Sequence, residues 1–441
     1  MLVAWSMIGC SSYSNAQRPS TNTVTNEAQQ PLSYFNIYRG NSHAHTIFTW
    51  THGEHREKGI SKLDEPTEFH PNYKVPTGMD WRDHTSINLD PTAYTNRQGL
   101  PENHFDLAIA NGYDFYAITD HTQEPPLQPV SADNWAWQAT LKAAEKYNSK
   151  PGFVAIAGFE YSRNSNANGG SGHINVLNVS EYVNADHGQR GPVPAWPEAN
   201  WTVPQFYKWV KTAKPHNPKA NVVVGFNHPS LDQYDDWAYI DEELRELIST
   251  FEIHTNYKQN RWKAYCRALN KGWKLSPIGV HDNHGFHQIL KKELPPPTFV
   301  LAPELTLEAI THAMRQRRTF VSFNEGVELR YAVNGFIMGS TLQKPDTFNF
   351  HIELKTPSSK PEEGIRRIQV LRNDPNGGDD MVIAAESIYD GSQSEIIWKP
   401  VIKDTSAKYF VLLIHHANDM VKNGNFKANG STISAPVWTG R

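Results

Sequence analysis

Residues 38–50 (YRGNSHAHTIFTW) hold the arrangement on which the fold depends. His43 and His45 are separated by one residue and follow a short run of strand-forming residues at 34–38. Both imidazoles can therefore be presented together at the end of one strand, where they can bind a metal ion. A single His-x-His is weak evidence, because alternating histidines also occur on solvated strands. It becomes informative because similar endings recur downstream.

Five later hydrophobic runs also end in His, Asp or Glu. They are residues 113–119 before Asp120 and His121, 153–159 before Glu160, 221–227 before His228, 250–253 before His254, and 276–281 before Asp282 and His284. His173 opens one further apolar run, GHINVL at 172–177. In an α/β barrel the carboxyl ends of the strands share one face, so side chains far apart in sequence converge there. The pattern therefore predicts a single metal-binding pocket.

This ordered set closely resembles the PHP (polymerase and histidinol phosphatase) superfamily of metallohydrolases. The resemblance covers roughly residues 35–325 and needs the whole set: His43-x-His45, Ile118-Thr119-Asp120-His121, Glu160, Gly172-His173, Asn227-His228-Pro229 and Asp282-x-His284. The segments GHINVLN, GVHDNH and LTLEAITHAMRQRRTFVSF, followed by a β-rich tail, resemble its CehA/McbA-like branch.

The resemblance implies a cluster of two or three divalent metal ions, with Zn, Mn or Fe suited to mixed His and carboxylate ligands. The implied ligands are His43, His45, His121, Glu160, His173, His228, Asp282 and His284. One departure from the family pattern stands at Thr49-Trp50-Thr51, where an Asp or His is common. Either His52 or His55 supplies that ligand from a longer loop, or the third metal position is lost.

Other residues are candidates for catalysis or substrate binding. We expect Asp120 to orient an imidazole, with an ordinary turn residue as the alternative. His254 and His52 are candidate proton donors to a leaving group. Arg163 and Arg82 could clamp an anionic substrate, although solvated surface charge is the commoner role for such residues.

The predicted function is hydrolysis by water that the metal ions activate. Most members of the superfamily act on phosphoesters, so a small or oligomeric phosphomonoester or phosphodiester is the leading substrate class. A carbamate, carboxylic ester or amide is the alternative on the same site. A non-enzymatic surface module that binds a glycan or a protein is the alternative of another class, and aromatic residues near Trp135, Trp137, Trp196 and Trp201 would suit it.

Helices and strands alternate over residues 102–317, which predicts a parallel sheet. The expected architecture is α/β, a distorted (β/α)7 PHP-type barrel at 33–325. Short alternating runs separated by turn signals follow at 326–441 and predict a small antiparallel β-sandwich of immunoglobulin-like type.

The N-terminal residues predict a location in the bacterial envelope, and the net charge argues against nucleic acid as a partner. Residues 7–10 (MIGC) resemble a bacterial lipoprotein cleavage box, so residues 1–32 are expected to be a signal and a disordered tether. A lipid at Cys10 would anchor the protein in the bacterial cell envelope, in the periplasm or at the outer membrane. With a net charge of −4, no basic field favours nucleic acid as a partner.

Overall fold

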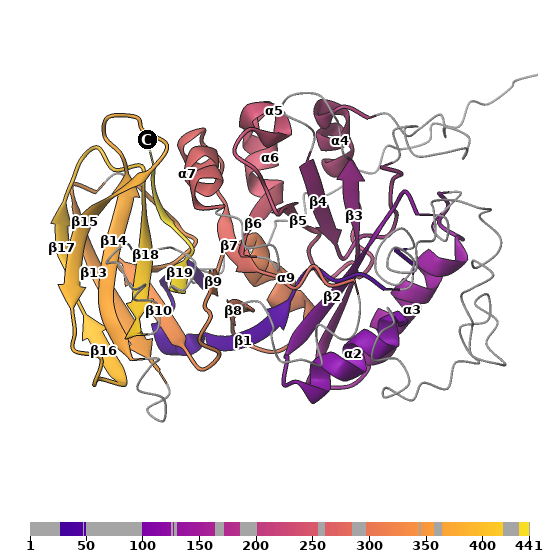
Figure 1. Cartoon of the computed structure of the whole chain (residues 1–441), viewed down its shortest axis with the longest axis horizontal. Helices are drawn as coiled ribbons and strands as arrows, with labels where there is room; N and C mark the ends of the chain where they lie inside the picture. Colours follow the sequence, from indigo (N-terminus) through magenta and orange to yellow (C-terminus); the bar gives the residue numbers. More distant parts are fainter. Residues whose placement is uncertain are drawn as a thin grey trace, which may run out of the picture.

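The computed structural model describes residues 27–46, 48–49, 99–124, 127, 130–163, 172–185, 201–254, 261–284, 297–343, 345–356, 364–417 and 432–440. In Figure 1 one half of the molecule carries the helices around a central sheet, and the other half consists of layered strands. The chain is therefore a mixed α/β protein with a strand-rich second half. Most of the expected tether, residues 1–26, lies outside the described residues.

The N-terminal half is built on seven strands that are neighbours in chain order: β1 (Asn36–Asn41), β2 (Phe115–His121), β3 (Val154–Arg163), β4 (Gly172–Leu177), β5 (Val223–Asn227), β6 (Ile248–His254) and β7 (Ser276–Gly279). The prediction of an all-parallel sheet is wrong, because β4 runs antiparallel to both β3 and β5. A parallel crossover needs about a dozen residues or more. The link at residues 164–171 is too short for one, so β4 returns directly beside β3.

The first and last of these strands meet at their carboxyl ends. A parallel bridge joins Ala44 to Asn283. The N–H of His45 donates to the carbonyl of Asn283 (3.0 Å), and the N–H of Asp282 donates to the carbonyl of His43 (3.0 Å). Among the described strands no hydrogen-bonded ladder continues from β7 to β1, so the closed barrel is not established. The contact nevertheless brings the histidines after β1 against the residues after β7.

Strand β8 (Thr298–Ala302) pairs with β1 and lies against β7. The Thr298 hydroxyl accepts from the Gly279 N–H (3.1 Å) and donates to the Gly279 carbonyl (2.7 Å). One buried side chain thereby replaces two ladder hydrogen bonds at the end of β7.

The helices of this half are α2 (Pro101–Ala110), α3 (Trp135–Asn148), α4 (Val203–Val210), α5 (Gln233–Trp237), α6 (Glu242–Leu247), α7 (Trp262–Asn270) and α9 (Leu307–Arg315). Their starts follow local capping rules: Asn134, Asp241 and Thr306 accept backbone N–H groups at the first turns of α3, α6 and α9. None of the described helices is both long and apolar enough to cross a membrane.

The sequence did not predict two details of this half, the burial of Trp137 and the backbone of α5. Trp137, a candidate exposed aromatic, is 1% exposed and packs against Phe159 and Tyr182. In α5, Tyr234 and the two residues after it have left-handed backbone angles, with φ of 56°, 51° and 55°. Left-handed turns of non-glycine residues are costly. The buried Tyr234 hydroxyl, which donates to the carbonyls of His173 (2.7 Å) and Asn227 (3.1 Å), helps to hold this turn in place.

The C-terminal half is a sandwich of two sheets. One contains β10 (Glu328–Val333), β11 (Phe336–Ile337), β13 (Thr347–Lys355), β16 (Glu395–Trp398) and β17 (Val401–Lys403), and the other contains β12 (Thr341–Gln343), β14 (Ile365–Asn373), β15 (Met381–Ile388), β18 (Tyr409–His416), β19 (Thr432–Ser434) and β20 (Val437–Gly440). Side chains from β13 and β18, including Phe350 and Leu412, share one apolar core.

The second of these sheets is continuous with the sheet of the N-terminal half. Strand β19 pairs with β9 (Thr319–Val321), and β9 pairs with β8. The expected boundary at 325/326 falls between β9 and β10 and stays a prediction, as does the immunoglobulin-like topology. Backbone hydrogen bonds therefore run without a break from the sheet of one half into the sheet of the other.

Thr298→Val should destabilise the fold by about 1–3 kcal/mol, because the buried N–H and carbonyl of Gly279 lose the hydroxyl that pairs with them. Urea or thermal unfolding measures the effect. Thr298→Ser keeps the hydroxyl and should cost clearly less. Equal stability of the valine variant and the wild type would show that the hydroxyl contributes nothing to joining β7 and β8.

Candidate metal centre

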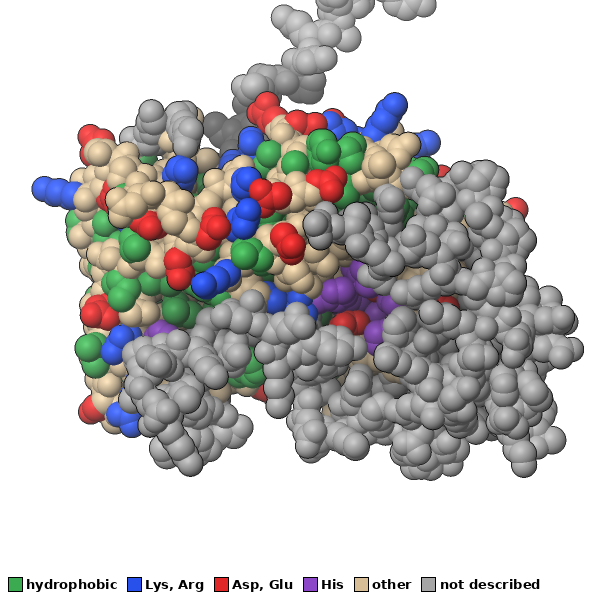
Figure 2. Space-filling view, turned by 45° about the horizontal axis from the view of Figure 1, so that its top comes forward, with side chains coloured by type: hydrophobic (Ala, Val, Ile, Leu, Met, Phe, Trp, Pro, Cys, Tyr) green, Lys and Arg blue, Asp and Glu red, His purple; other side chains and the backbone are tan. Residues whose placement is uncertain are grey.

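The eight candidate metal ligands come together where the strands end. They extend from β1 and the residues after it (His43, His45), β2 (His121), β3 (Glu160), β4 (His173), the residue after β5 (His228) and the segment after β7 (Asp282, His284). Figure 2 shows histidine side chains gathered on one face beside acidic side chains. Segments from the whole N-terminal half thus contribute to one site.

Glu160 lies at the centre of this cluster and is fully buried. Its Oε2 atom is 2.6 Å from His121 Nε2, 3.5 Å from His43 Nε2 and 3.6 Å from His45 Nε2. Three imidazole nitrogens thus surround one carboxylate oxygen, whereas a single hydrogen bond would need only one of them.

The other oxygen of Glu160, Oε1, faces a different set of groups. It is 3.0 Å from His173 Nδ1 and 3.4 Å from His228 Nε2, and it accepts a hydrogen bond from Asn227 Nδ2 (2.8 Å). Each carboxylate oxygen therefore has its own histidines.

The Nε2 atoms of His43 and His45 are only 3.0 Å apart. Their Nδ1 atoms are already engaged, since His43 Nδ1 lies 2.7 Å from Glu252 Oε1 and His45 Nδ1 lies 3.2 Å from Thr49 Oγ1. If these Nδ1 atoms carry the protons, two lone pairs face each other at hydrogen-bond distance. Only a positive charge between them makes that arrangement favourable, so these residues fit a metal ion.

Glu252 is a member of the site that the sequence analysis did not identify. It is fully buried in β6, and its Oε2 accepts the backbone N–H of His228 (2.7 Å) while Oε1 holds His43. Carboxylates that orient ligating histidines fix the tautomer and raise the basicity of the metal-facing nitrogen. The available signal was a glutamate inside an apolar strand, which is costly to bury unless it is paired.

Asp120 acts on an imidazole indirectly. One of its oxygens accepts from the Thr46 N–H and the Thr49 hydroxyl (2.7 Å each), and the other accepts from the Thr46 hydroxyl (2.7 Å). Because Thr49 donates its proton to Asp120, its oxygen can accept from His45 Nδ1. Asp120 therefore reaches His45 through Thr49, in an Asp120–Thr49–His45 chain.

Asp282 and His284 complete the cluster. Asp282 Oδ1 lies 3.2 Å from His45 Nε2 and 3.5 Å from His43 Nε2. The His284 ring stacks on the His45 ring with centroids 4.1 Å apart. Three sets of residues each bring one ligand atom per residue within 4.8 Å of the others in the set. The sets are His45, His121 and His284; His43, His45 and Glu160; and His121, Glu160 and His173.

The backbone is strained at two of these positions. His228 and Asp282 both have positive φ angles, 29° and 46° respectively. Such conformations cost energy for residues other than glycine and persist where the surroundings determine them strongly. Their occurrence at two candidate ligands indicates that the fold places these side chains at a cost to local stability.

The carboxylates favour positive charge at His121 and His43, whereas burial and the neighbouring imidazoles of His228 and His121 lower the pKa of His173 to about 4. Burial alone would lower the pKa of His121, but Glu160 and Glu124 outweigh it and raise that pKa to about 9. Burial likewise opposes protonation of His43, yet Glu252, Glu160 and Asp282 hold its pKa well above the usual value. The carboxylates thus create a buried place for cations.

The remaining candidates are less informative. His52 and Arg82 lie outside the described residues, as does His55. The backbones of Arg163 and His254 belong to β3 and β6, but their side chains lie outside the described part of the chain. These four site predictions, His52, Arg82, Arg163 and His254, stay predictions.

Arg261 is a second residue that the sequence analysis missed. It precedes α7, is 4% exposed, and donates from Nη1 to the Pro229 carbonyl (3.3 Å). Burial lowers its pKa, while the nearby Glu252 and Asp282 carboxylates oppose that effect. No sequence signal distinguished it from surface arginines, because its burial depends on the surrounding strands.

Comparisons with known proteins add distant likenesses. Residues 124–232, which include Glu160, His173 and His228, match a family model described as a protein of unknown function (DUF3604). No curated protein matches the chain in sequence.

Two solved structures are similar over parts of the chain. One is a two-domain protein containing a predicted PHP-like metal-dependent phosphoesterase from Bacteroides vulgatus, 16% identical over 88% of this chain and 93% of that chain, with a TM-score of 0.40. The other is a β-glucosidase from Listeria innocua in complex with glucose, 8% identical over 47% of this chain and 39% of that chain, with a TM-score of 0.17.

Glu252→Gln should weaken metal binding about 10- to 100-fold. An amide has one acceptor atom, so it cannot accept from both His43 Nδ1 and the His228 N–H as the carboxylate does. Competition with a coloured chelator measures the affinity. Glu243→Gln, which changes an exposed glutamate, is the matched control, and equal affinities in the two variants would refute the role of Glu252.

Thr49→Val should weaken metal binding about tenfold, because it removes the hydroxyl between Asp120 and His45 and keeps the side-chain shape. Thr49→Ser retains the hydroxyl and should bind metal nearly as well as the wild type. Metal content per chain after dialysis against a fixed free metal concentration distinguishes the two. If the Thr49→Ser and Thr49→Val variants retain the same amount of metal, the hydroxyl does not support His45.

Proposed function

We propose that this chain is a multinuclear metal-dependent hydrolase of the PHP type, in its CehA/McbA-like branch, that acts on phosphomonoesters or phosphodiesters. The observation that carries the proposal is the buried Glu160 carboxylate, whose two oxygens each face a separate set of imidazoles. A bridging carboxylate between histidine-rich positions is what a two-metal hydrolase requires. The His45, His121 and His284 group supports a further metal position without a ligand from residues 50–98.

The chain's own residues would hold two or three divalent ions at this site. When bound, such ions lower the pKa of a water molecule and neutralise charge that develops on the attacked oxygen. Glu252 and the Asp120–Thr49 pair keep Nδ1 of His43 and His45 occupied, so Nε2 of each histidine would be left to hold an ion.

Arg261 supports a phosphoester as the substrate class. It is a buried guanidinium close enough to Glu252 and Asp282 for their charges to affect its pKa. A guanidinium binds phosphate oxygens in a planar, bidentate manner. We propose that Arg261 contacts the phosphoryl group of the substrate, and that His254 or His52 gives a proton to the leaving group.

The proposed location in the bacterial envelope rests on the sequence alone. Met7-Ile8-Gly9-Cys10 supports acylation of Cys10 and attachment to the bacterial envelope. We propose that the enzyme acts there on a small or oligomeric ester.

The first test measures metal content and hydrolysis on the same samples. Wild-type protein purified without added metal or chelator should contain at least two equivalents of metal and hydrolyse a chromogenic phosphoester. Glu160→Gln should lose most of the metal and about 100-fold or more of the activity, since a neutral amide bridges cations poorly. Glu145→Gln, an exposed glutamate on α3, is the control.

Two results would contradict parts of the proposal. Hydrolysis of a carboxylic ester or a carbamate in place of the phosphoester would identify the alternative substrate class. A folded wild type that binds no divalent metal at millimolar concentration would refute the hydrolase and favour a surface-binding module.

A second test separates the substrate classes through Arg261. Arg261→Gln should raise KM for the phosphoester about tenfold or more, because it removes a charge-assisted contact, and should change KM for a neutral carboxylic ester much less. Arg261→Lys should recover only part of the loss. Equal effects on both substrates would assign Arg261 a structural role at Pro229.

A further inference from the structure

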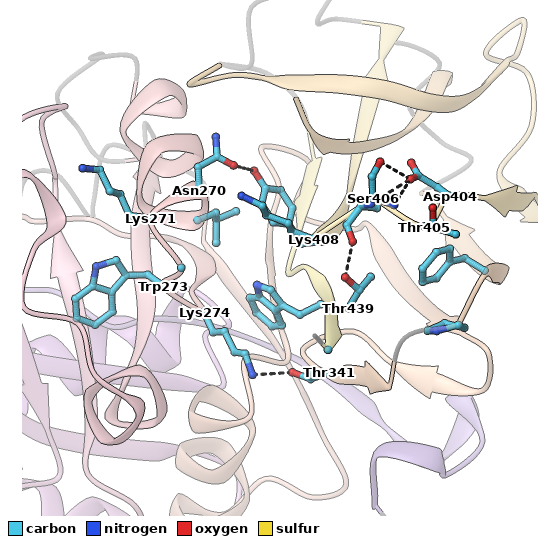
Figure 3. A pocket seen from close by; sticks show the side chains of 18 of the residues that line it. Asn270, Lys271, Trp273, Lys274, Thr341, Asp404, Thr405, Ser406, Lys408 and Thr439 are labelled. Atoms are coloured by element: carbon cyan, nitrogen blue, oxygen red, sulfur yellow. Dashed lines mark hydrogen bonds between the residues drawn. The ribbon is translucent and has the colours of Figure 1, made fainter. Parts of the chain in front are cut away.

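A cavity of about 950 Å³ lies between the two halves of the molecule, away from the metal centre. One wall is formed by the end of α7 and the following residues, Leu269 to Lys274, and the other by the sandwich residues Asp404 to Tyr409 and Trp438 to Gly440. Figure 3 shows these labelled side chains approaching from both halves. The volume is within the range of small-molecule sites, which occur preferentially at domain interfaces.

The walls of the cavity are held together by hydrogen bonds across the interface. Tyr409 of the sandwich hydrogen-bonds through its hydroxyl to Asn270 Oδ1 (2.9 Å), and Lys274 Nζ donates to the Thr341 hydroxyl (3.0 Å), as Figure 3 shows. Trp262 Nε1 at the other end of α7 donates to Asp380 Oδ1 (3.1 Å). The cavity is therefore preformed, which lowers the entropic cost of binding a ligand.

The cavity lining carries an excess of positive charge. Its basic residues are Arg245, Lys271, Lys274 and Lys408, and its acidic residues are Asp346 and Asp404.

Two of these charges are already paired with residues outside the lining. Lys271 pairs with Asp236 (2.9 Å), and Asp404 pairs with Arg372. The lining charges that remain are three cations, Arg245, Lys274 and Lys408, and one carboxylate, Asp346; Lys274 also lies near Glu246 outside the lining.

Lys274 lies among both cations and carboxylates. Its ammonium lies 4.0 Å from Glu246 Oε1, at the limit of an ion pair. Burial lowers the pKa of Lys274. Glu246 and Glu242 oppose this effect, and the neighbouring cations Arg317 and Arg245 add to it. An anion in the cavity would stabilise the charged form of this lysine.

The rest of the lining suits a polyhydroxylated ligand. Hydroxyl groups come from Thr341, Thr405, Ser406 and Thr439. Thr341 accepts from Lys274, Ser406 donates to Asp404 and Thr439 donates to the Ala407 carbonyl, so these three would meet a sugar hydroxyl with their remaining lone pairs. The large aromatic side chains of the lining are mostly buried in the cavity walls: Trp273 is 0%, Tyr409 1% and Trp438 5% exposed. They offer apolar edges but no open face on which a nucleobase could stack.

We propose that this interface cavity binds an anionic sugar, a saccharide that carries a carboxylate or a sulfate group. Arg245, Lys274 and Lys408 would bind the anionic group. The hydroxyl side chains would bind the sugar hydroxyls. The inference does not depend on the metal centre or on the proposed hydrolysis.

The test is calorimetric or ligand-observed NMR titration of the full chain with glucuronate and with glucose 6-sulfate. At least one of them should bind, and neutral glucose and inorganic sulfate should each bind at least about tenfold more weakly, since each provides half of the recognised chemistry. Lys408→Ala and Lys274→Met should each lower the affinity for the sugar anion about tenfold. Lys399→Ala, an exposed lysine outside the cavity lining, should not change binding.

His43→Ala separates this site from the metal centre. Binding of the sugar anion should persist in that variant, even if all hydrolytic activity is lost. The proposal is overturned if neither sugar anion binds, if glucose or sulfate binds as tightly, if both lysine variants bind like the wild type, or if His43→Ala abolishes binding.

Discussion

The buried charge of Glu160 is the constraint on which the arrangement of the N-terminal half depends. A carboxylate without access to water is very unfavourable unless cations or strong donors surround it. The chain meets this requirement with imidazoles from four strands, each delivered at a strand end. The imidazoles surround the carboxylate, and the carboxylate in turn brings their ring nitrogens together.

Around these ligands lies a second set of buried groups that determines where each nitrogen points. Glu252 holds His43 from β6, and Thr49 holds His45 with its own hydroxyl oriented by Asp120. Such contacts are effective because the interior is apolar and each hydrogen bond there has few competitors. The positive φ angles at His228 and Asp282 show that local backbone preference gives way to this arrangement.

The two halves of the chain are joined by a shared sheet and by contacts of α7. Backbone pairing through β8, β9 and β19 links the first half to the sandwich, while α7 contacts the loop that precedes β15. Between these two connections lies the cavity lined by Lys274 and Lys408. The sandwich therefore supplies one wall of this cavity as well as a structural support.

The sequence by itself determined the order of the ligands, the positions of most helices and the β-rich second half. These features depend on local rules: apolar runs that end in polar residues, capping residues such as Asn134, and turn signals between short strands. Only the tertiary structure decided that β4 runs antiparallel, that Trp137 is buried, and that Glu252, Thr49 and Arg261 belong to the site. Those outcomes depend on which strands become neighbours and which face of each strand turns inward. Neighbour relations of this kind arise from contacts between residues far apart in the chain, which local sequence patterns do not specify.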